Sequence, residues 1–142
     1  MPENEIICKT ITSFFGLSNV EVLNNFRLNS DEVLERKNTH YPARLLYLSR
    51  VSKNKGIFKL IDAMKIINDK KTLCCLDIYG KTEFTKDEED IFEENLCETI
   101  SYKGIIDNDF VSGLFSNYDI LVFPTQYISE GTPGIISEAL IA

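Results

Sequence analysis

Apolar and polar residues follow two rhythms from residue 43 onward. Short apolar runs, typical of buried strands, are separated by segments in which apolar side chains recur every three or four positions, as on one face of a helix. The expected strands are residues 44–49, 72–79, 100–104 and 119–123, and the expected helices are residues 55–67, 87–98, 108–118 and one that begins at Pro133. Strands that alternate with helices form parallel βαβ units, so the sequence predicts an α/β fold with a Rossmann-like, doubly wound parallel sheet.

The first 42 residues lack this regular alternation. Residues 1–19 carry apolar side chains at helical spacing up to Gly16, and residues 20–24 alternate in the manner of a short strand. Residues 27–42 are rich in charged side chains and are expected to form a helical turn and a loop on the surface. These segments carry no chemistry of their own.

Composition narrows the class of protein. The chain has 142 residues, of which 44% are hydrophobic and 26% charged, as in a single globular domain. Its longest apolar runs, such as residues 73–76 and 120–123, are far too short to span a membrane, and its first residues do not resemble a signal peptide. A cytoplasmic location is therefore expected. The net charge of −7, with scattered basic residues, argues against nucleic acid or an anionic membrane as the main partner.

Cysteine and histidine offer no metal site. Cys8, Cys74, Cys75 and Cys97 lack metal-ligand spacing, and His40 is the single histidine of the sequence. We expect no bound metal, Cys74 and Cys75 as reduced residues in or near the core, and His40 in a surface loop. One histidine outside every motif also leaves no Ser-His-Asp or Cys-His set to assemble.

The last stretch of the sequence predicts a site for an anion. Glu130 lies in the loop after the last strand, Thr132 is a plausible N-cap, Pro133 suits the first helical position, and Glu138 lies about two turns further on. The start of a helix presents unpaired backbone N–H groups and a partial positive charge, which favour phosphate. Carboxylates on both sides accept hydrogen bonds from hydroxyls, so the stretch fits a nucleotide sugar. A plain strand-to-helix connection with two solvated glutamates is the alternative.

The loop after the first strand is basic. Arg50, Lys53 and Lys55 fall within six residues, directly after the carboxyl end of a strand, where doubly wound sheets bind their ligands. Arginine and lysine donate charge-assisted hydrogen bonds to phosphate. The alternative is an ordinary basic surface loop ahead of a helix.

These two stretches resemble one known family. Glu130 and Glu138, with seven residues between them and set within Phe-Pro-Thr, Glu-Gly-Thr-Pro and Glu-Ala-Leu, resemble the E-x7-E motif of the family 4 glycosyltransferases (glycosyl transferases group 1), which are retaining enzymes of the GT-B fold. Arg50 and Lys55 match the basic positions of the family's G-R-x4-K-G loop, with Ser49 in place of the usual glycine. The resemblance covers residues 20–142.

The resemblance implies a role for each site residue. Glu130 would accept from the hydroxyls of the donor sugar, and Glu138 from those of the ribose, while Arg50 and Lys55 stabilise charge on the departing diphosphate. Glu130, Arg50 and Lys55 are thus the expected catalytic residues. Backbone groups would complete the substrate site, from Gly131, Thr132, Pro133 and Gly134 toward sugar and phosphate and from Ile105 toward the nucleobase. The donor is a substrate, so no cofactor and no metal are implied. Asp119 is expected to be structural.

The resemblance also implies a division into domains. Residues 20–142 would form the donor-binding, C-terminal half of a GT-B enzyme, truncated at its C-terminal end, and residues 1–19 the tail of an N-terminal domain. That other domain would hold a glycan or lipid-linked acceptor of polysaccharide biosynthesis, so this chain alone is expected to be inactive. Two alternatives are a GT-B sugar-nucleotide epimerase or phosphorylase domain and a non-enzymatic α/β signalling domain, although the latter would need an acidic pocket where this loop is basic.

Overall fold

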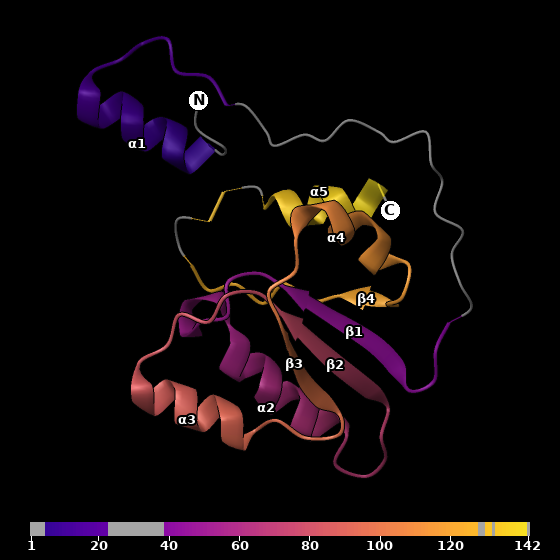
Figure 1. The fold of residues 1–142 in the computed structure, drawn as a ribbon. Helices are drawn as coiled ribbons and strands as arrows, with labels where there is room; N and C mark the ends of the chain where they lie inside the picture. Colours follow the sequence, from indigo (N-terminus) through magenta and orange to yellow (C-terminus); the bar gives the residue numbers. More distant parts are fainter. Residues whose placement is uncertain (1–4, 23–38, 128–129, 132, 142) are drawn as a thin grey trace.

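The computed structural model describes residues 5–22, 39–127, 130–131 and 133–141, and its centre is one parallel sheet. The strands are β1 (Ala43–Leu48), β2 (Cys74–Tyr79), β3 (Ile100–Gly104) and β4 (Ile120–Leu121). Their order across the sheet is β3-β2-β1-β4, and all three pairings are parallel (Figure 1). The predicted α/β fold is confirmed.

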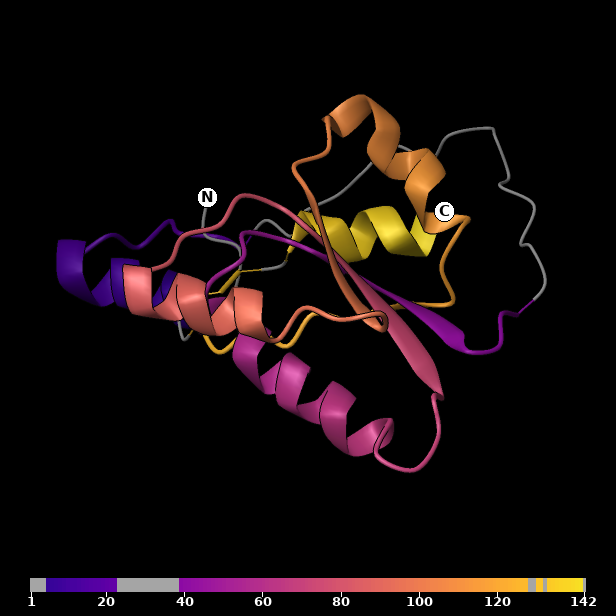
Figure 2. The ribbon, with the colours of Figure 1, turned by 60° about the horizontal axis from the view of Figure 1, so that its bottom comes forward.

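Helices cover both faces of the sheet, as a doubly wound fold requires. The short 3-10 helix η1 (Lys53–Lys55) leads into α2 (Ile57–Ile67), which lies with α3 (Lys86–Glu94) on one face. On the other face lie α4 (Asn108–Phe115) and α5 (Gly134–Ile141), which contact one another (Figure 2).

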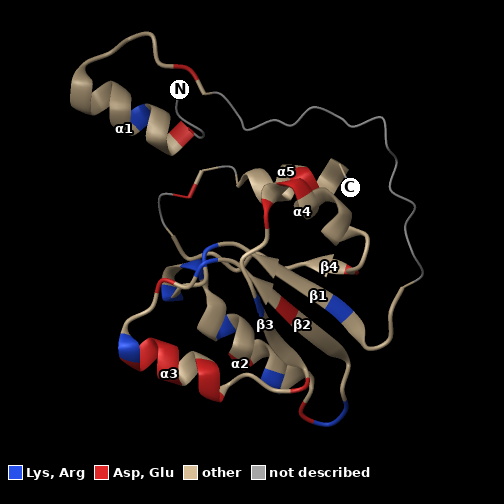
Figure 3. Ribbon diagram, in the orientation of Figure 1, with Lys and Arg blue, Asp and Glu red and all other residues tan. Residues whose placement is uncertain are grey.

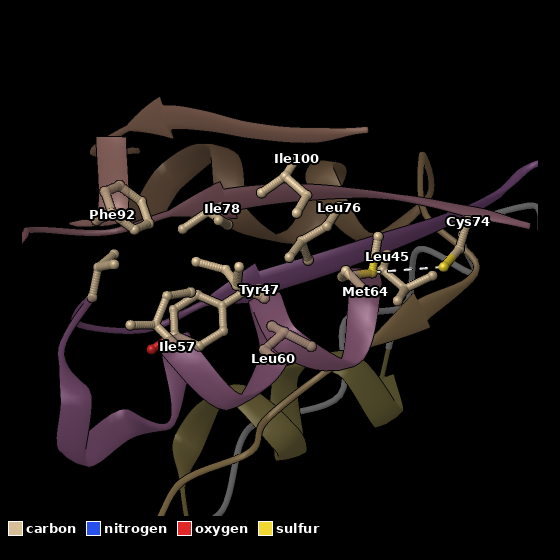
Figure 4. Close-up of a cluster of buried hydrophobic side chains, with 12 residues drawn as sticks. Leu45, Tyr47, Ile57, Leu60, Met64, Cys74, Leu76, Ile78, Phe92 and Ile100 are labelled. Carbon is tan, nitrogen blue, oxygen red and sulfur yellow. Dashed lines mark hydrogen bonds between the residues drawn. The ribbon is translucent and has the colours of Figure 1, made fainter. Parts of the chain in front are cut away.

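The main core lies between the sheet and α2. Alternate residues of β2 are buried, which places Cys74, Leu76 and Ile78 on the inner face of the sheet. They pack against the apolar stripe of α2, where Met64 Sδ lies 3.6 Å from Cys74 Sγ (Figure 4). Cys75 is half-buried, so both cysteines of β2 lie in or near the core, as the sequence predicts, while Cys97 is exposed. Cys97 lies in the turn that joins α3 to β3.

A capping box sets the start of α3 one residue earlier than predicted. The Thr85 side chain accepts a hydrogen bond from the Glu88 backbone N–H, and the Glu88 carboxylate accepts one from the Thr85 N–H. The helix ends at Glu94, short of the predicted residue 98, because the Asn95 and Leu96 N–H groups turn back onto Phe92 and Glu93. This turn leads directly into β3.

The last strand is much shorter than predicted. β4 is an edge strand of two residues, although its flanking N–H groups continue the ladder, from Asp119 to the Arg44 carbonyl (2.9 Å) and from Val122 to that of Leu46 (2.8 Å). After Val122 the chain turns away from β1. Pro124 has no N–H to donate, so the ladder could not have continued through it.

Asp119 has the structural role that the sequence predicts. Its carboxylate accepts from the Arg44 backbone N–H at 2.8 Å and the His40 N–H at 3.1 Å, which fixes the entry into β1. The His40 ring also lies 3.1 Å from Asp119 Oδ2. His40 lies in a loop, as the sequence predicts, and is half-buried against Asp119.

The N-terminal segment forms α1 (Glu5–Phe15), at the place predicted by its apolar spacing. None of the residues of α1 is buried, and Phe14 and Phe15 lie edge to face on its surface. Residues 20–22 are not in a strand, and the rest of the predicted strand, like most of the predicted surface turn, lies outside the described residues. No helix in the described part of the chain is long and apolar enough to cross a membrane.

Gly56 should not tolerate a side chain. Its φ is +80°, and a Cβ there would lie 2.0 Å from the Pro124 carbonyl oxygen, so Gly56→Ala combines backbone strain with a clash between two loops. We expect a loss of more than about 2 kcal/mol in the free energy of unfolding, measured by urea denaturation.

Gly113→Ala is the matched control. Gly113 lies within α4, and a Cβ there would meet nothing within 4 Å, so alanine should be neutral or stabilising by up to about 1 kcal/mol. Equal effects of the two substitutions would contradict the close contact between Gly56 and Pro124.

Candidate active site

The candidate site lies where the strand order reverses. β1 and β4 are neighbours in the sheet, although β2 and β3 lie between them in sequence, so the loops that follow β1 and β4 meet at the carboxyl edge. The Gln126 N–H donates to the Asn54 carbonyl at 2.9 Å, and Gly56 lies against Pro124. Basic segments gather beyond this edge, while α3 is mainly acidic (Figure 3). The two predicted site segments, the loops after β1 and β4, therefore lie next to each other.

Lys55 lies at the centre of the candidate site. It ends η1, where its backbone N–H donates to the Ser52 carbonyl at 3.1 Å, and only 7% of the residue is exposed. The Lys55 ammonium group donates to Glu130 Oε2. The Phe123 and Tyr127 rings have their centroids 5.7 and 5.6 Å from Lys55 Nζ, within reach of a cation–π interaction. The site thus holds a buried, paired cation.

Glu130 is held by a second donor. Thr125 Oγ1 donates to the same carboxylate oxygen at 2.7 Å. Burial alone would raise the pKa of Glu130, but the hydrogen bonds from Lys55 and Thr125 and the charges of Lys55 and Arg50 outweigh it and lower that pKa. Glu130 is therefore an ionised acceptor at neutral pH.

Arg50 is the exposed cation of the site. Its side chain is 59% exposed, and Nη1 lies 3.3 Å from Glu83 Oε2 on the loop after β2. Backbone hydrogen bonds hold these two loops together, since the Val51 N–H donates to Lys81 and the Glu83 N–H donates to Val51. Arg50 is thus presented at the rim of the site.

A glycine allows the loops after β1 and β2 to approach. A Cβ on Gly80 would lie 1.8 Å from the Ser49 carbonyl oxygen, and the φ of Gly80 is +136°. Ser49 is the residue that stands in place of the first glycine of the G-R-x4-K-G loop. The close contact between the two loops depends on the absence of a side chain at Gly80 and involves the backbone carbonyl of Ser49.

The remaining predicted site residues lie in two other places, one in and just before α5 and the other just beyond β3. Gly131 and Pro133 are half-buried, and α5 begins at Gly134, one residue later than predicted. Glu138 is half-buried in the middle of α5, and Ile105 is 72% exposed just beyond β3. Thr132, the predicted N-cap, lies outside the described residues. In the described ranges no three His, Cys, Asp or Glu side chains are grouped to hold a metal ion.

Sequence reasoning missed the immediate surroundings of Lys55 and Glu130. Thr125 belongs to the Phe-Pro-Thr segment that marks the family, but it received no role, and Phe123, Tyr127 and Glu83 were not singled out. A hydroxyl five residues before a carboxylate gives no periodic signal. The direct pairing of Lys55 with Glu130 was also not predicted, because each had been assigned to a different part of the donor.

The pairing predicts how stability depends on pH. The pKa of Glu130 is lowered by folding, so its contribution to stability is present above its unfolded pKa and is lost as pH falls through the folded value. Glu130→Gln leaves Lys55 buried without its carboxylate and should cost about 1–3 kcal/mol at neutral pH, measured by urea denaturation. The difference from wild type should shrink as pH falls below about 4. Glu89→Gln, on the exposed surface of α3, is the control. If the difference in stability between wild type and Glu130→Gln were the same at every pH, the pairing would be contradicted.

Comparisons with known proteins bear on the family and the fold. The family model for glycosyl transferases group 1 matches residues 30–142. No match was found among curated proteins. Two solved structures of TarM are similar in fold. One, a mutant of S. aureus TarM in complex with fondaparinux, α-GlcNAc-glycerol and UDP, has a TM-score of 0.74 and 20% identity over 97% of this chain. The other, of TarM, has a TM-score of 0.71 and 21% identity over 99% of this chain.

The similarity to TarM is limited in length and in kind. This chain spans 27% of the length of each TarM chain, and at these identities the likeness concerns the fold, a Rossmann-like half of the GT-B architecture. The family match covers most of the sequence, including both loops of the candidate site. The chain belongs to the group 1 glycosyltransferases.

Proposed function

We propose that this domain binds a nucleoside diphosphate sugar and presents the sugar for transfer, with retention of configuration, to a glycan or lipid-linked acceptor held by a second domain. The single observation that carries the proposal is the buried pair of Lys55 and Glu130 at the point where the strand order reverses. The pair joins a donor for phosphate to an acceptor for hydroxyls, which are the two chemical features of such a ligand.

The diphosphate would be held by Arg50 and Lys55. Arg50 is exposed at the rim and can offer a planar fork of N–H groups, while Lys55 offers a concentrated charge in a dry environment. In the structure both cations are engaged by carboxylates, Arg50 by Glu83 and Lys55 by Glu130. A diphosphate supplies negative charge that can replace these partners.

The sugar and the ribose would be held by the two glutamates. When phosphate takes over Lys55, Glu130 can accept from sugar hydroxyls, and Thr125 continues to donate to it. Glu138 on α5 would accept from the ribose hydroxyls, with backbone groups of residues 131–134 facing the sugar and phosphate, through the N–H of each residue except Pro133, and the backbone of Ile105 facing the base. No metal or cofactor is needed in this arrangement.

The same residues would lower the barrier to transfer. As the bond between the sugar and the diphosphate breaks, negative charge grows on the leaving phosphate oxygen. Arg50 and Lys55 interact more strongly with that charge than with the ground state, and such preorganised electrostatic stabilisation raises the rate. Transfer also needs an acceptor and a cleft closed to water, so this chain alone should bind a donor but transfer its sugar poorly.

Calorimetric titration tests donor binding. The chain is titrated with UDP, GDP, ADP and their sugar conjugates, and we expect selective binding of one nucleotide series. Arg50→Ala should weaken that binding roughly tenfold, since a charge-assisted hydrogen bond is lost, whereas Lys53→Ala removes an exposed cation of the same loop and should have little effect.

Glu138→Gln tests the ribose contact in the same way, with Glu93→Gln on the exposed surface of α3 as its control. Binding that is equal in the site variants and in their controls would contradict the assigned roles. A folded chain that binds none of the nucleotides would contradict the proposed function itself.

Glu83→Gln should have the opposite effect on binding. Glu83 competes with the donor for Arg50, and its ion pair is exposed, so its removal should tighten binding of the preferred nucleoside diphosphate by about two- to fivefold. Added salt should reduce this gain, because the charges lie in water. Glu94→Gln, also an exposed glutamate, is the control, and weaker binding of that nucleotide by Glu83→Gln would show that Glu83 supports Arg50 and does not compete for it.

A further inference from the structure

The hydroxyl of Thr125 lies between two groups that fix the direction of its hydrogen bonds. Oγ1 is 2.7 Å from Glu130 Oε2 and 3.3 Å from the Tyr127 backbone nitrogen. An ionised carboxylate can only accept, and a backbone N–H can only donate. The single proton of the hydroxyl therefore points to Glu130, and an oxygen lone pair receives the Tyr127 N–H.

The backbone of the same segment closes a ring of hydrogen bonds. The Glu130 N–H donates to the Tyr127 carbonyl at 3.0 Å, so both the backbone and the side chain of Glu130 are tied to residues 125–127. These bonds connect the end of the Phe-Pro-Thr segment to the glutamate. The position of the carboxylate is thereby coupled to that of one hydroxyl group.

Lys55 and Thr125 approach the same oxygen of Glu130. Lys55 belongs to the β1 loop, whereas Thr125 belongs to the same loop as Glu130. A ligand that draws Lys55 away would remove one donor from Oε2 and leave the local one in place. Charge-assisted hydrogen bonds of this kind are shorter and stronger than neutral ones.

We infer that Thr125 is a positioning residue, whose hydroxyl holds the Glu130 carboxylate in one orientation before and after Lys55 is engaged by a ligand. The importance of this role for sugar transfer rests on the proposed function. The role itself is a property of the ligand-free chain and can be tested without a donor.

The test compares Thr125→Val with Thr125→Ser. Valine keeps the shape of threonine and removes the hydroxyl, while serine keeps the hydroxyl and removes the methyl group. The titration of the Glu130 carboxyl group is followed by carbon-detected NMR in the ligand-free chain, with its signal assigned by its loss in Glu130→Gln. In Thr125→Val the midpoint should move to higher pH, because a donor to the charged form is lost, and in Thr125→Ser it should stay at the wild-type position.

Hydrogen exchange of the Tyr127 amide gives a second readout. Thr125→Val removes the acceptor of this N–H, so exchange should be about two- to tenfold faster, whereas Thr125→Ser should retain protection. The Leu76 amide in β2, which donates to Thr99, serves as an internal control for folding. If valine perturbs the sheet, Thr125→Ala gives the same comparison.

Equal midpoints in wild type and Thr125→Val, or an equal shift in the valine and serine variants, would overturn the inference. Neither result depends on nucleotide binding. A chain that binds no sugar nucleotide but shows the hydroxyl-specific shift would contradict the proposed function and leave the positioning role intact.

Discussion

The parallel pairing of β1 with β4 brings together the two loops at the centre of the candidate site. The register Leu45 with Ile120 and Leu46 with Leu121 sends the two following loops to the same edge of the sheet. Gly56 then admits the Pro124 carbonyl, and Asn54 receives the Gln126 N–H. Lys55 and Glu130 are 75 residues apart in sequence, and they meet because this pairing places their loops side by side.

Burying the Lys55 ammonium group is costly, and the cost decides what surrounds it. A charge removed from water needs a partner, and here it has a carboxylate and two aromatic faces. Replacing such a pair with apolar side chains often leaves stability unchanged or improved, so folding alone gives little reason for it. A site that must receive an anion gives a better reason, since the cation is already desolvated.

The sequence predicts elements well where the physical signal is local. β3 has the predicted bounds, and the helices differ from prediction mainly at their ends, where Thr85 and Asn95 redirect the chain by hydrogen bonds that periodicity does not record. β4 is shorter than predicted because an apolar run looks the same in an edge strand as in a central one. The loops of the site could be predicted from strand ends, but the Lys55–Glu130 contact could not, since it depends on strand order and side-chain packing.

The parts of the site that follow β1 and β4 differ in how much buried structure supports them. The fully buried core cluster consists of residues from 45 to 100, and neither β4 nor α5 contributes to it. Each residue of α5 is at least partly exposed. Elements with so little buried apolar surface open locally at a smaller free-energy cost than the core does. β4 and α5 should therefore open away from the β1–β3 core without global unfolding, and a ligand that bridges Lys55 and Glu138 would oppose that opening.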